Sequence, residues 1–173
     1  MSKCLRSIIA LVFCVLARTA IPQDLYVPAE LEPWRNWVLH EKDYRLCPFV
    51  FNRAGTAPGD FVCAWPGSLT ISVDSRGGTF SQAWTIYAGE QWLVLPGDSN
   101  FWPENVQVDG RPGSVVLREG SPTLRMGPGR YSVSGRFNWE QRPQQLAIPR
   151  QSGLLALNID GKRIARPDRN PAG

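Results

Sequence analysis

The sequence predicts a mainly β protein, an antiparallel β-sandwich of jelly-roll-like type with about eight short strands and one short N-terminal helix. Three observations predict it. Glycine and proline supply 16 and 15 of the 173 residues, which favours tight turns over long helices. Apolar and polar residues alternate with period two through much of the chain. Asp-Gly dipeptides follow such runs, and these residues suit the left-handed backbone of a tight hairpin turn.

The first segment, residues 1–17, has the pattern of a signal peptide. Lys3 and Arg6 precede an apolar run of ten residues, Ile8–Ala17. This run is too short to cross a hydrocarbon core, which needs about 20 residues, so it resembles the apolar region of a secretory signal. Cleavage is expected after Ala17, with Ala20 as the alternative. The sequence therefore predicts an exported protein of the periplasm, cell envelope or extracellular space, without a stable membrane span after cleavage.

Export changes the interpretation of the four cysteines. Two of them lie in the signal segment, which leaves Cys47 and Cys63 in a compartment where disulfides persist. A bridge between them closes a loop of about 17 residues, worth roughly 3 kcal/mol in the chain-entropy model. The alternative, a zinc site, needs four ligands, and these cysteines with His40 cannot supply them. We expect a disulfide, no metal and no cofactor.

The expected helix lies near the start of the mature chain, within Ala29–His40. Leu31, Trp34 and Val38 recur there at spacings of three and four, which predicts two or three helical turns. Pro33 lies near the expected start, where a missing N–H costs little.

Beyond the helix, period-two alternation predicts strands. Alternating apolar residues occur over 69–73, 80–86 and 92–95, and Arg130–Trp139 shows the clearest pattern. In that segment Tyr131, Val133, Gly135 and Phe137 share one face, while arginine and serine occupy the other. Turns are expected at residues 74–78 and at the dipeptides Asp109-Gly110, Glu119-Gly120 and Asp160-Gly161. No change in composition divides residues 18–173, which predicts one domain.

One turn and several longer segments resemble known proteins. Leu124–Gly135 resembles the L-x-x-x-P-G-x-Y-x-V turn and strand of secreted transthyretin-like and carbohydrate-binding sandwich modules. The longer order of segments is similar to the N-terminal β-sandwich region of long, uncharacterised envelope proteins of Gram-negative bacteria. That family has no assigned chemistry to carry over. The resemblance implies a shortened member, truncated at its C-terminus. The segments are Trp102-Pro103, Val106–Pro112, Phe137–Trp139 and Leu155–Gly161.

The titratable residues do not predict catalysis. His40, the single histidine, lies near Glu41, Asp43 and Cys47, but a disulfide at Cys47 removes the thiol that a Cys-His pair needs. No Gly-x-Ser-x-Gly elbow supports a serine nucleophile. We expect a protein that is not an enzyme, with no catalytic residues and with a hydrolase as the remaining alternative.

Seven tryptophans are the clearest indication of binding. Exposed indole rings offer a large contact area at little conformational cost, to sugars or to a protein partner. Trp84 and Trp139 lie on apolar strand faces and are expected in the core. Either Phe101 or Trp102 should be exposed, because adjacent side chains of an extended segment point to opposite sides. The candidate ligand contacts are Trp34, Trp37, Trp65 and Trp102.

The charge is unevenly distributed. Removing residues 1–17 takes away two basic residues and no acids, so the formal charge falls from +4 to +2, and nucleic acid is not expected as a partner. Arginine nevertheless outnumbers lysine 16 to 3, and its guanidinium suits bidentate contact with carboxylate or phosphate. Arg130 and Arg136 share the polar face of the best strand, and we expect Arg118 and Arg125 on its hairpin neighbours. These four arginines form a candidate basic face, unless they pair with the acidic half of the chain.

Together these patterns predict a non-catalytic interaction module of the cell envelope. Its expected partner is an envelope protein or an adjacent domain. The alternative is a carbohydrate-binding module that contacts a glycan through exposed tryptophan faces.

Overall fold

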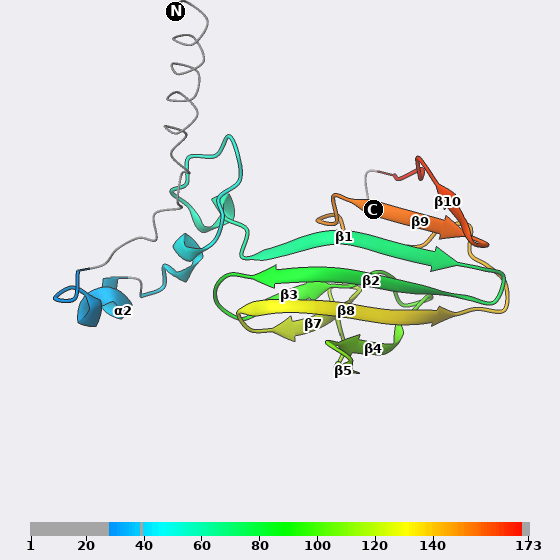
Figure 1. Cartoon of the computed structure of the whole chain (residues 1–173), viewed down its shortest axis with the longest axis horizontal. Coiled ribbons are helices and arrows are strands. Elements are labelled where there is room, and N and C mark those ends of the chain that lie inside the picture. Colours follow the sequence, from blue (N-terminus) through cyan, green and yellow to red (C-terminus); the bar gives the residue numbers. More distant parts are fainter. Residues whose placement is uncertain (1–27, 39, 171–173) are drawn as a thin grey trace, which may run out of the picture. The chain divides into compact units, whose positions relative to one another are not determined.

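The structure is a computed structural model that describes residues 28–38 and 40–170 (Figure 1). The chain divides into two units, Met1–Val38 and Leu39–Gly173, and each is described by itself. The predicted signal segment and both candidate cleavage sites lie outside the described residues. Within the described ranges, no helix combines the length and the apolar character needed to cross a membrane.

The first unit contains a 3-10 turn, η1 (Glu32–Trp34), followed by α2 (Arg35–Val38). The expected helix of two or three turns is therefore not confirmed, because α2 has only four residues. No residue of η1 is buried. Short helices obtain most of their stability from packing an apolar face, and these exposed residues lack such packing.

The second unit carries the strands. It opens with two 3-10 turns, η2 (Asp43–Leu46) and η3 (Pro58–Asp60), which precede the first strand. The described residues contain ten strands: β1 (Ala64–Val73), β2 (Gly77–Ile86), β3 (Gln91–Val94), β4 (Glu104–Val108), β5 (Arg111–Pro112), β6 (Val116–Arg118), β7 (Ser121–Met126), β8 (Gly129–Asn138), β9 (Leu155–Ile159) and β10 (Lys162–Ile164).

These strands form two sheets, so the prediction of a mainly β protein is confirmed. The large sheet has the order β10-β9-β1-β2-β8-β4-β5, with β1, β2 and β8 as its long central strands (Figure 1), and the small sheet has the order β3-β7-β6. The number of strands exceeds the expected eight, because β5, β6 and β10 have only two or three residues and show no readable periodicity.

One strand pair corrects the expectation of a wholly antiparallel protein. β9 pairs with β1 in parallel, from Leu69 opposite Leu155 to Val73 opposite Ile159. The long connection between β8 and β9 brings the chain back to the free side of β1. A parallel pair requires such a crossover, whereas an antiparallel pair can be joined by a tight turn.

The predicted turns and strand faces are confirmed. Asp109 and Gly110 have φ angles of 50° and 77° between β4 and β5, and Asp160 and Gly161 have 49° and 77° between β9 and β10. Both pairs have the positive φ values of the tight hairpin turn that Asp-Gly favours. The strand predicted over Arg130–Trp139 is β8, and it buries Val133 and Phe137 as expected.

Both sheets contribute side chains to one hydrophobic core. The large sheet supplies most of the core, and β3 and β7 of the small sheet add Leu93 and Leu124. The buried cluster consists of Leu69, Ile71, Phe80, Trp84, Ile86, Leu93, Leu95, Val106, Leu124, Val133 and Phe137. The period-two pattern of the sequence therefore divides each long strand into a buried face and an outer face.

A polar side chain lies inside this core. Gln82 is only 3% exposed, and its Nε2 donates hydrogen bonds to the Gly67 carbonyl oxygen and to Ser152 Oγ, both at 3.0 Å. Gly67 lies where the register of β1 and β2 shifts between Pro66 and Leu69. Gln82 therefore connects this irregularity of β1 to the connection that leads into β9.

Candidate binding surfaces

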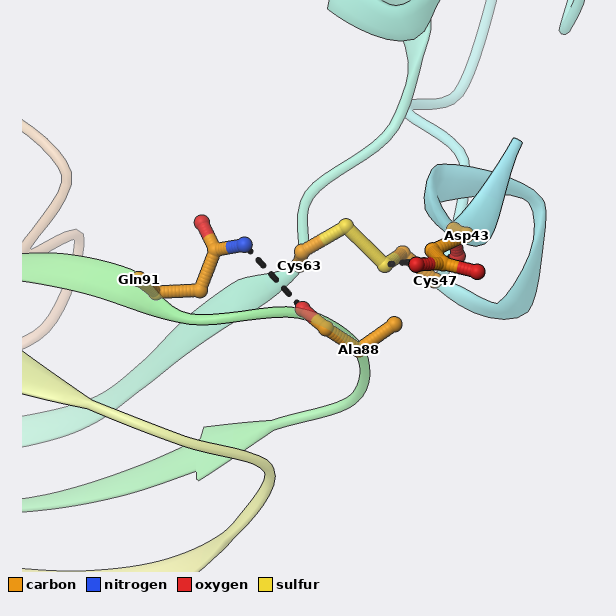
Figure 2. Close-up of a disulfide and its surroundings, with 5 residues drawn as sticks. All are labelled: Asp43, Cys47, Cys63, Ala88 and Gln91. Carbon is orange, nitrogen blue, oxygen red and sulfur yellow. Dashed lines mark hydrogen bonds between the residues drawn. A yellow bond between two sulfur atoms is a disulfide. The ribbon is translucent and has the colours of Figure 1, made fainter. Parts of the chain in front are cut away.

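A disulfide joins Cys47 to Cys63 and closes the loop that precedes β1 (Figure 2). The Cα atoms are 4.8 Å apart, and the Tyr87 N–H donates to the Cys63 carbonyl oxygen at 2.9 Å. Figure 2 shows the bridge near the turn after β2, where Gln91 Nε2 donates to the Ala88 carbonyl oxygen at 3.0 Å. The predicted disulfide is thus present, and it holds the loop at the start of the large sheet.

The closed loop exposes apolar side chains. Four of them occur within six consecutive residues, with Phe51 93% exposed and Phe49 62% exposed. The backbone beneath them is ordered by the bridge between Phe49 and Phe61 and by the Val50 N–H, which donates to the Asp60 carbonyl oxygen at 2.7 Å. We call this set, Leu46, Phe49, Val50 and Phe51, the loop patch.

A carboxylate fixes the other half of the loop. Asp60 Oδ2 accepts hydrogen bonds from the backbone N–H groups of Ala57 at 3.2 Å and Thr56 at 3.1 Å. The hydrogen bond from Ala57 is the main reason that the pKa of Asp60 lies below its usual value, and the Arg53 guanidinium contributes. The charged form of Asp60 therefore stabilises the turn that supports the loop patch.

The outer face of the large sheet is polar. The side chains that alternate with the buried ones are mostly hydroxyls, amides and guanidinium groups, and cross-strand pairs align them in rows. Asn158 Nδ2 donates to Ser72 Oγ at 3.2 Å across β9 and β1, which confirms that these two side chains share a face. The set that we call the outer face is Trp65, Thr70, Ser72, Thr79, Ser81, Ala83, Thr85, Gln107, Arg130, Ser132, Ser134, Arg136, Asn158 and Arg163.

A shallow hollow of about 320 Å³ lies in the outer face. Hydroxyl and amide groups from β1, β2, β4 and β8 line it, including Thr70, Ser81, Gln107 and Ser134, with Arg136 beside them. These groups can both donate and accept hydrogen bonds. The hollow can therefore bind a polyhydroxylated ligand.

The four predicted basic-face arginines do not lie on neighbouring strands. Arg130 and Arg136 lie on the outer face, on β8, whereas Arg118 and Arg125 lie on β6 and β7 of the small sheet. The expectation that Arg118 and Arg125 are on hairpin neighbours of β8 is wrong. The chain passes from the small sheet to the large one at the Gly-Pro turn between β7 and β8, and sequence adjacency does not show this.

Arg118 and Arg125 instead flank Trp92. Their guanidinium carbons lie 5.0 Å and 5.8 Å from the centre of the indole ring, which is cation–π distance. Arg125 also pairs with Glu90, and Arg118 lies 3.6 Å from the Glu119 carboxylate. A hollow of about 770 Å³ extends from Trp92 and Arg125 to Tyr131. These arginines already have internal partners, as the alternative of internal pairing expected.

The four candidate tryptophans occupy different environments. Trp34 and Trp37 lie in the first unit, 60% and 74% exposed, with their ring centres 6.2 Å apart in an edge-to-face pair. Trp65 lies on β1 and is 48% exposed. Trp102 is half-buried in the connection between β3 and β4. The structure does not describe the two units relative to each other, so a single tryptophan site stays a prediction.

The expectations for the remaining aromatic residues divide. Trp84 is buried, as predicted. Trp139 is half-buried, stacks on Phe137 and donates from Nε1 to the Asp74 carbonyl oxygen at 3.1 Å. Phe101 packs edge-to-face on Trp139 and is half-buried like Trp102, so neither of these two adjacent side chains is fully exposed.

The residues considered for catalysis have no catalytic arrangement. Cys47 is in the disulfide, and its sulfur lies 3.9 Å from the Asp43 carbonyl oxygen, a contact and not a hydrogen bond, since a disulfide sulfur carries no hydrogen. His40 is exposed. Within residues 28–38 and 40–170, no three His, Cys, Asp or Glu side chains are grouped so that they could hold a metal ion.

A third hollow, of about 660 Å³, lies where the inner face of β1 and β9 meets the connection after β8. Its lining is largely apolar, including Ile71, Leu146, Leu157 and Trp139. Arg169 borders it and donates to the carbonyl oxygens of Ser152 and Pro149 at 2.6 Å and 2.9 Å. The last described residues thus close one side of this hollow.

Sequence reasoning missed the loop patch and the role of Arg163. The run Leu46–Phe51 was available as a signal, because consecutive apolar residues in a turn-rich loop cannot all be buried. Arg163 gave no such signal. Its place on the outer face follows from its pairing with Asn158 and from the parallel pairing of β9 with β1, which are properties of the tertiary structure.

Comparisons with known proteins place the chain in no family. No family model matches the sequence, and no curated protein matches it. Partial similarity is found to the M1 zinc metallopeptidase of Deinococcus radiodurans, at 12% identity and a TM-score of 0.30, over 47% of this chain and 19% of that one. A two-domain M1 zinc metallopeptidase bound to L-arginine gives 10% identity and a TM-score of 0.31, over 53% and 30%. The match spans less than a third of these enzymes, and likeness at this level assigns no function.

Proposed function

We propose that the protein is an exported, non-catalytic interaction module of the cell envelope that binds a protein partner or an adjacent domain through the loop patch. The observation that carries this proposal is the exposure of Phe49 and Phe51 on a loop closed by a disulfide. Exposed, clustered apolar side chains are typical of interaction sites. A loop ordered before binding also loses less conformational entropy when it binds. We further propose that the two sheets pack as the layers of a sandwich, since both contribute to one core.

The test is site-specific photo-crosslinking in the cell that makes the protein. A photoreactive phenylalanine analogue at Phe51 should crosslink to one defined envelope protein. The Phe49→Ser change should weaken that crosslink, because it removes an adjacent apolar contact. The same analogue at Thr56, an exposed position of the same loop, is the matched control. No crosslink at Phe51, or an equal one at Thr56, would overturn the proposal.

Carbohydrate binding is the second candidate function, and the outer face favours it. Hydroxyl and amide groups line the hollow, and the exposed indole of Trp65 lies on the same face. A sugar ring offers hydroxyls to the first and an apolar face to the second. A glycan array is the test, with Trp65→Ala as the variant and Trp92→Ala as a control on the small sheet. Binding that Trp65→Ala leaves unchanged, or no bound glycan, would remove this candidate.

A further inference from the structure

The outer face carries three arginines without internal partners. Arg130, Arg136 and Arg163 are exposed, and none has a side-chain hydrogen bond or ion pair to another residue that the structure describes. Glu104 lies opposite Arg136 in the register of β4 and β8, but its carboxylate accepts a hydrogen bond from Asn138 Nδ2. The other arginines with a printed partner, such as Arg118, Arg125, Arg142 and Arg169, contact neighbouring groups of the protein.

The spacing of these arginines favours an extended ligand. Arg130 and Arg136 are six residues apart on β8, which corresponds to about 20 Å along a strand. Arg136 and Arg163 lie in one cross-strand row, through Thr79, Ser72 and Asn158. The row spans four strand intervals, or about 19 Å at the usual spacing. No single small anion can reach two of these groups, whereas a chain with repeated anionic groups can.

The surface between the arginines selects among polyanions. It consists of serine, threonine, asparagine and glutamine side chains, with no large apolar residue except Trp65. Protein interfaces have an apolar core, which this face lacks. Nucleic acid carries a charge about every 1.7 Å of duplex, which calls for a denser array of cations. Sugar hydroxyls and widely spaced carboxylates match what the face offers.

We propose that the outer face of the large sheet binds an acidic polysaccharide. The sugar hydroxyls bind the serine, threonine and amide side chains, and the carboxylates pair with Arg130, Arg136 and Arg163. Arginine suits this role because its guanidinium binds a carboxylate through two parallel hydrogen bonds. The inference rests on carbohydrate binding as the second candidate function, and it names the class of sugar.

The test compares polygalacturonate, neutral dextran and single-stranded DNA as ligands of the full mature chain, by calorimetric titration. The triple variant Arg130→Gln, Arg136→Gln and Arg163→Gln should weaken binding of polygalacturonate by about tenfold or more, since each exposed ion pair is worth up to about 1 kcal/mol. A matched triple variant, Arg53→Gln, Arg111→Gln and Arg118→Gln, removes the same charge elsewhere and should change affinity less than about twofold. Circular dichroism checks that both variants fold.

The contradicting outcomes can be told apart. Dextran bound as tightly as polygalacturonate, with no effect of the first triple variant, overturns the acidic specificity and leaves carbohydrate binding in place. Equal losses in both triple variants, or DNA bound as tightly as polygalacturonate, would show attraction by net charge alone. Binding of neither polysaccharide overturns carbohydrate binding and the inference with it.

Discussion

At the residue scale, single side chains fix the turns that set the strand register. Asp74 Oδ1 accepts hydrogen bonds from the backbone N–H groups of Arg76 at 2.7 Å and Gly77 at 3.0 Å, at the turn between β1 and β2. The hydrogen bond from Arg76 is the main reason that the pKa of Asp74 lies below its usual value near 3.8. Because the folded state favours the charged carboxylate, this stabilisation is present at neutral pH and is lost as the pH falls through the lowered pKa.

The first prediction concerns this acid dependence. Asp74→Asn keeps a side-chain oxygen but removes the charge, so the free energy of unfolding of the variant should fall less than that of the wild type between about pH 5 and about pH 2. Urea unfolding at several pH values measures it. Asp168→Asn is the control, since its carboxylate accepts no hydrogen bond from a described residue. Parallel pH curves for the wild type and Asp74→Asn would contradict the prediction.

The second prediction concerns a glycine on the buried face of β8. A Cβ at Gly135 would lie 2.6 Å from Phe80 Cε1 and 2.9 Å from Phe80 Cζ, inside the core. Gly135→Ala should therefore lower the free energy of unfolding by about 1–3 kcal/mol, as overpacking does. Gly153→Ala is the matched control, because nothing lies within 4 Å of its Cβ position. Equal unfolding midpoints for the two variants would show that Phe80 can move aside freely.

At the scale of elements, the disulfide decides whether the loop patch is presented. The loop from Cys47 to Cys63 contains a single 3-10 turn and one isolated bridge, so few backbone hydrogen bonds order it. Its sequence could be recognised as turn-rich, but the loop patch depends on where the bridge fixes both ends. A surface of this kind is ordered by one covalent bond and not by the core.

The third prediction follows from this dependence. The double variant Cys47→Ser and Cys63→Ser should lose up to about 3 kcal/mol in the free energy of unfolding, the chain-entropy value for this loop length. Trypsin should cleave after Arg53 faster in the variant than in the oxidised wild type, because the loop opens more often. Cleavage after Arg166, which lies outside the loop, is the internal control. An unchanged rate at Arg53 would show that the loop is ordered without its bridge.

At the scale of the whole molecule, distant segments build the large sheet. Leu69 pairs with Leu155, and the buried Gln82 bonds to Ser152, which is 70 residues away in sequence. Such non-local pairing pays a loop-closure cost before any contact forms, so β-rich chains of this kind fold slowly, in milliseconds to seconds. The outer face exists only once these pairings are complete.

The fourth prediction concerns the mature protein as a whole. When the full chain is expressed in its natural cell, the exported product should begin at Arg18, because the segment before it has the pattern of a cleaved signal. N-terminal sequencing and intact mass measure this. Thiol titration of the unfolded product should find no free thiol, since the two remaining cysteines form the bridge. An uncleaved product, or two reactive thiols, would contradict the prediction.

The sequence by itself determined the features that arise from neighbouring residues. Alternation along β1, β2 and β8 determined which side chains are buried, the Asp-Gly pairs determined the tight turns, and the cysteine count after export indicated one disulfide. Even Gln82 fell on the buried face by periodicity. These features are local, because a side chain's direction in a strand depends only on its position along that strand.

The tertiary structure alone decided which strands are neighbours, and with them the candidate sites. It separated Arg118 and Arg125 from β8, paired β9 with β1 in parallel, and aligned Arg163 with Arg136 across the outer face. Sequence spacing cannot show this, because the pairing of distant strands is chosen by how the buried faces fill one common core. The outer face is therefore a product of the same packing that holds the two sheets together.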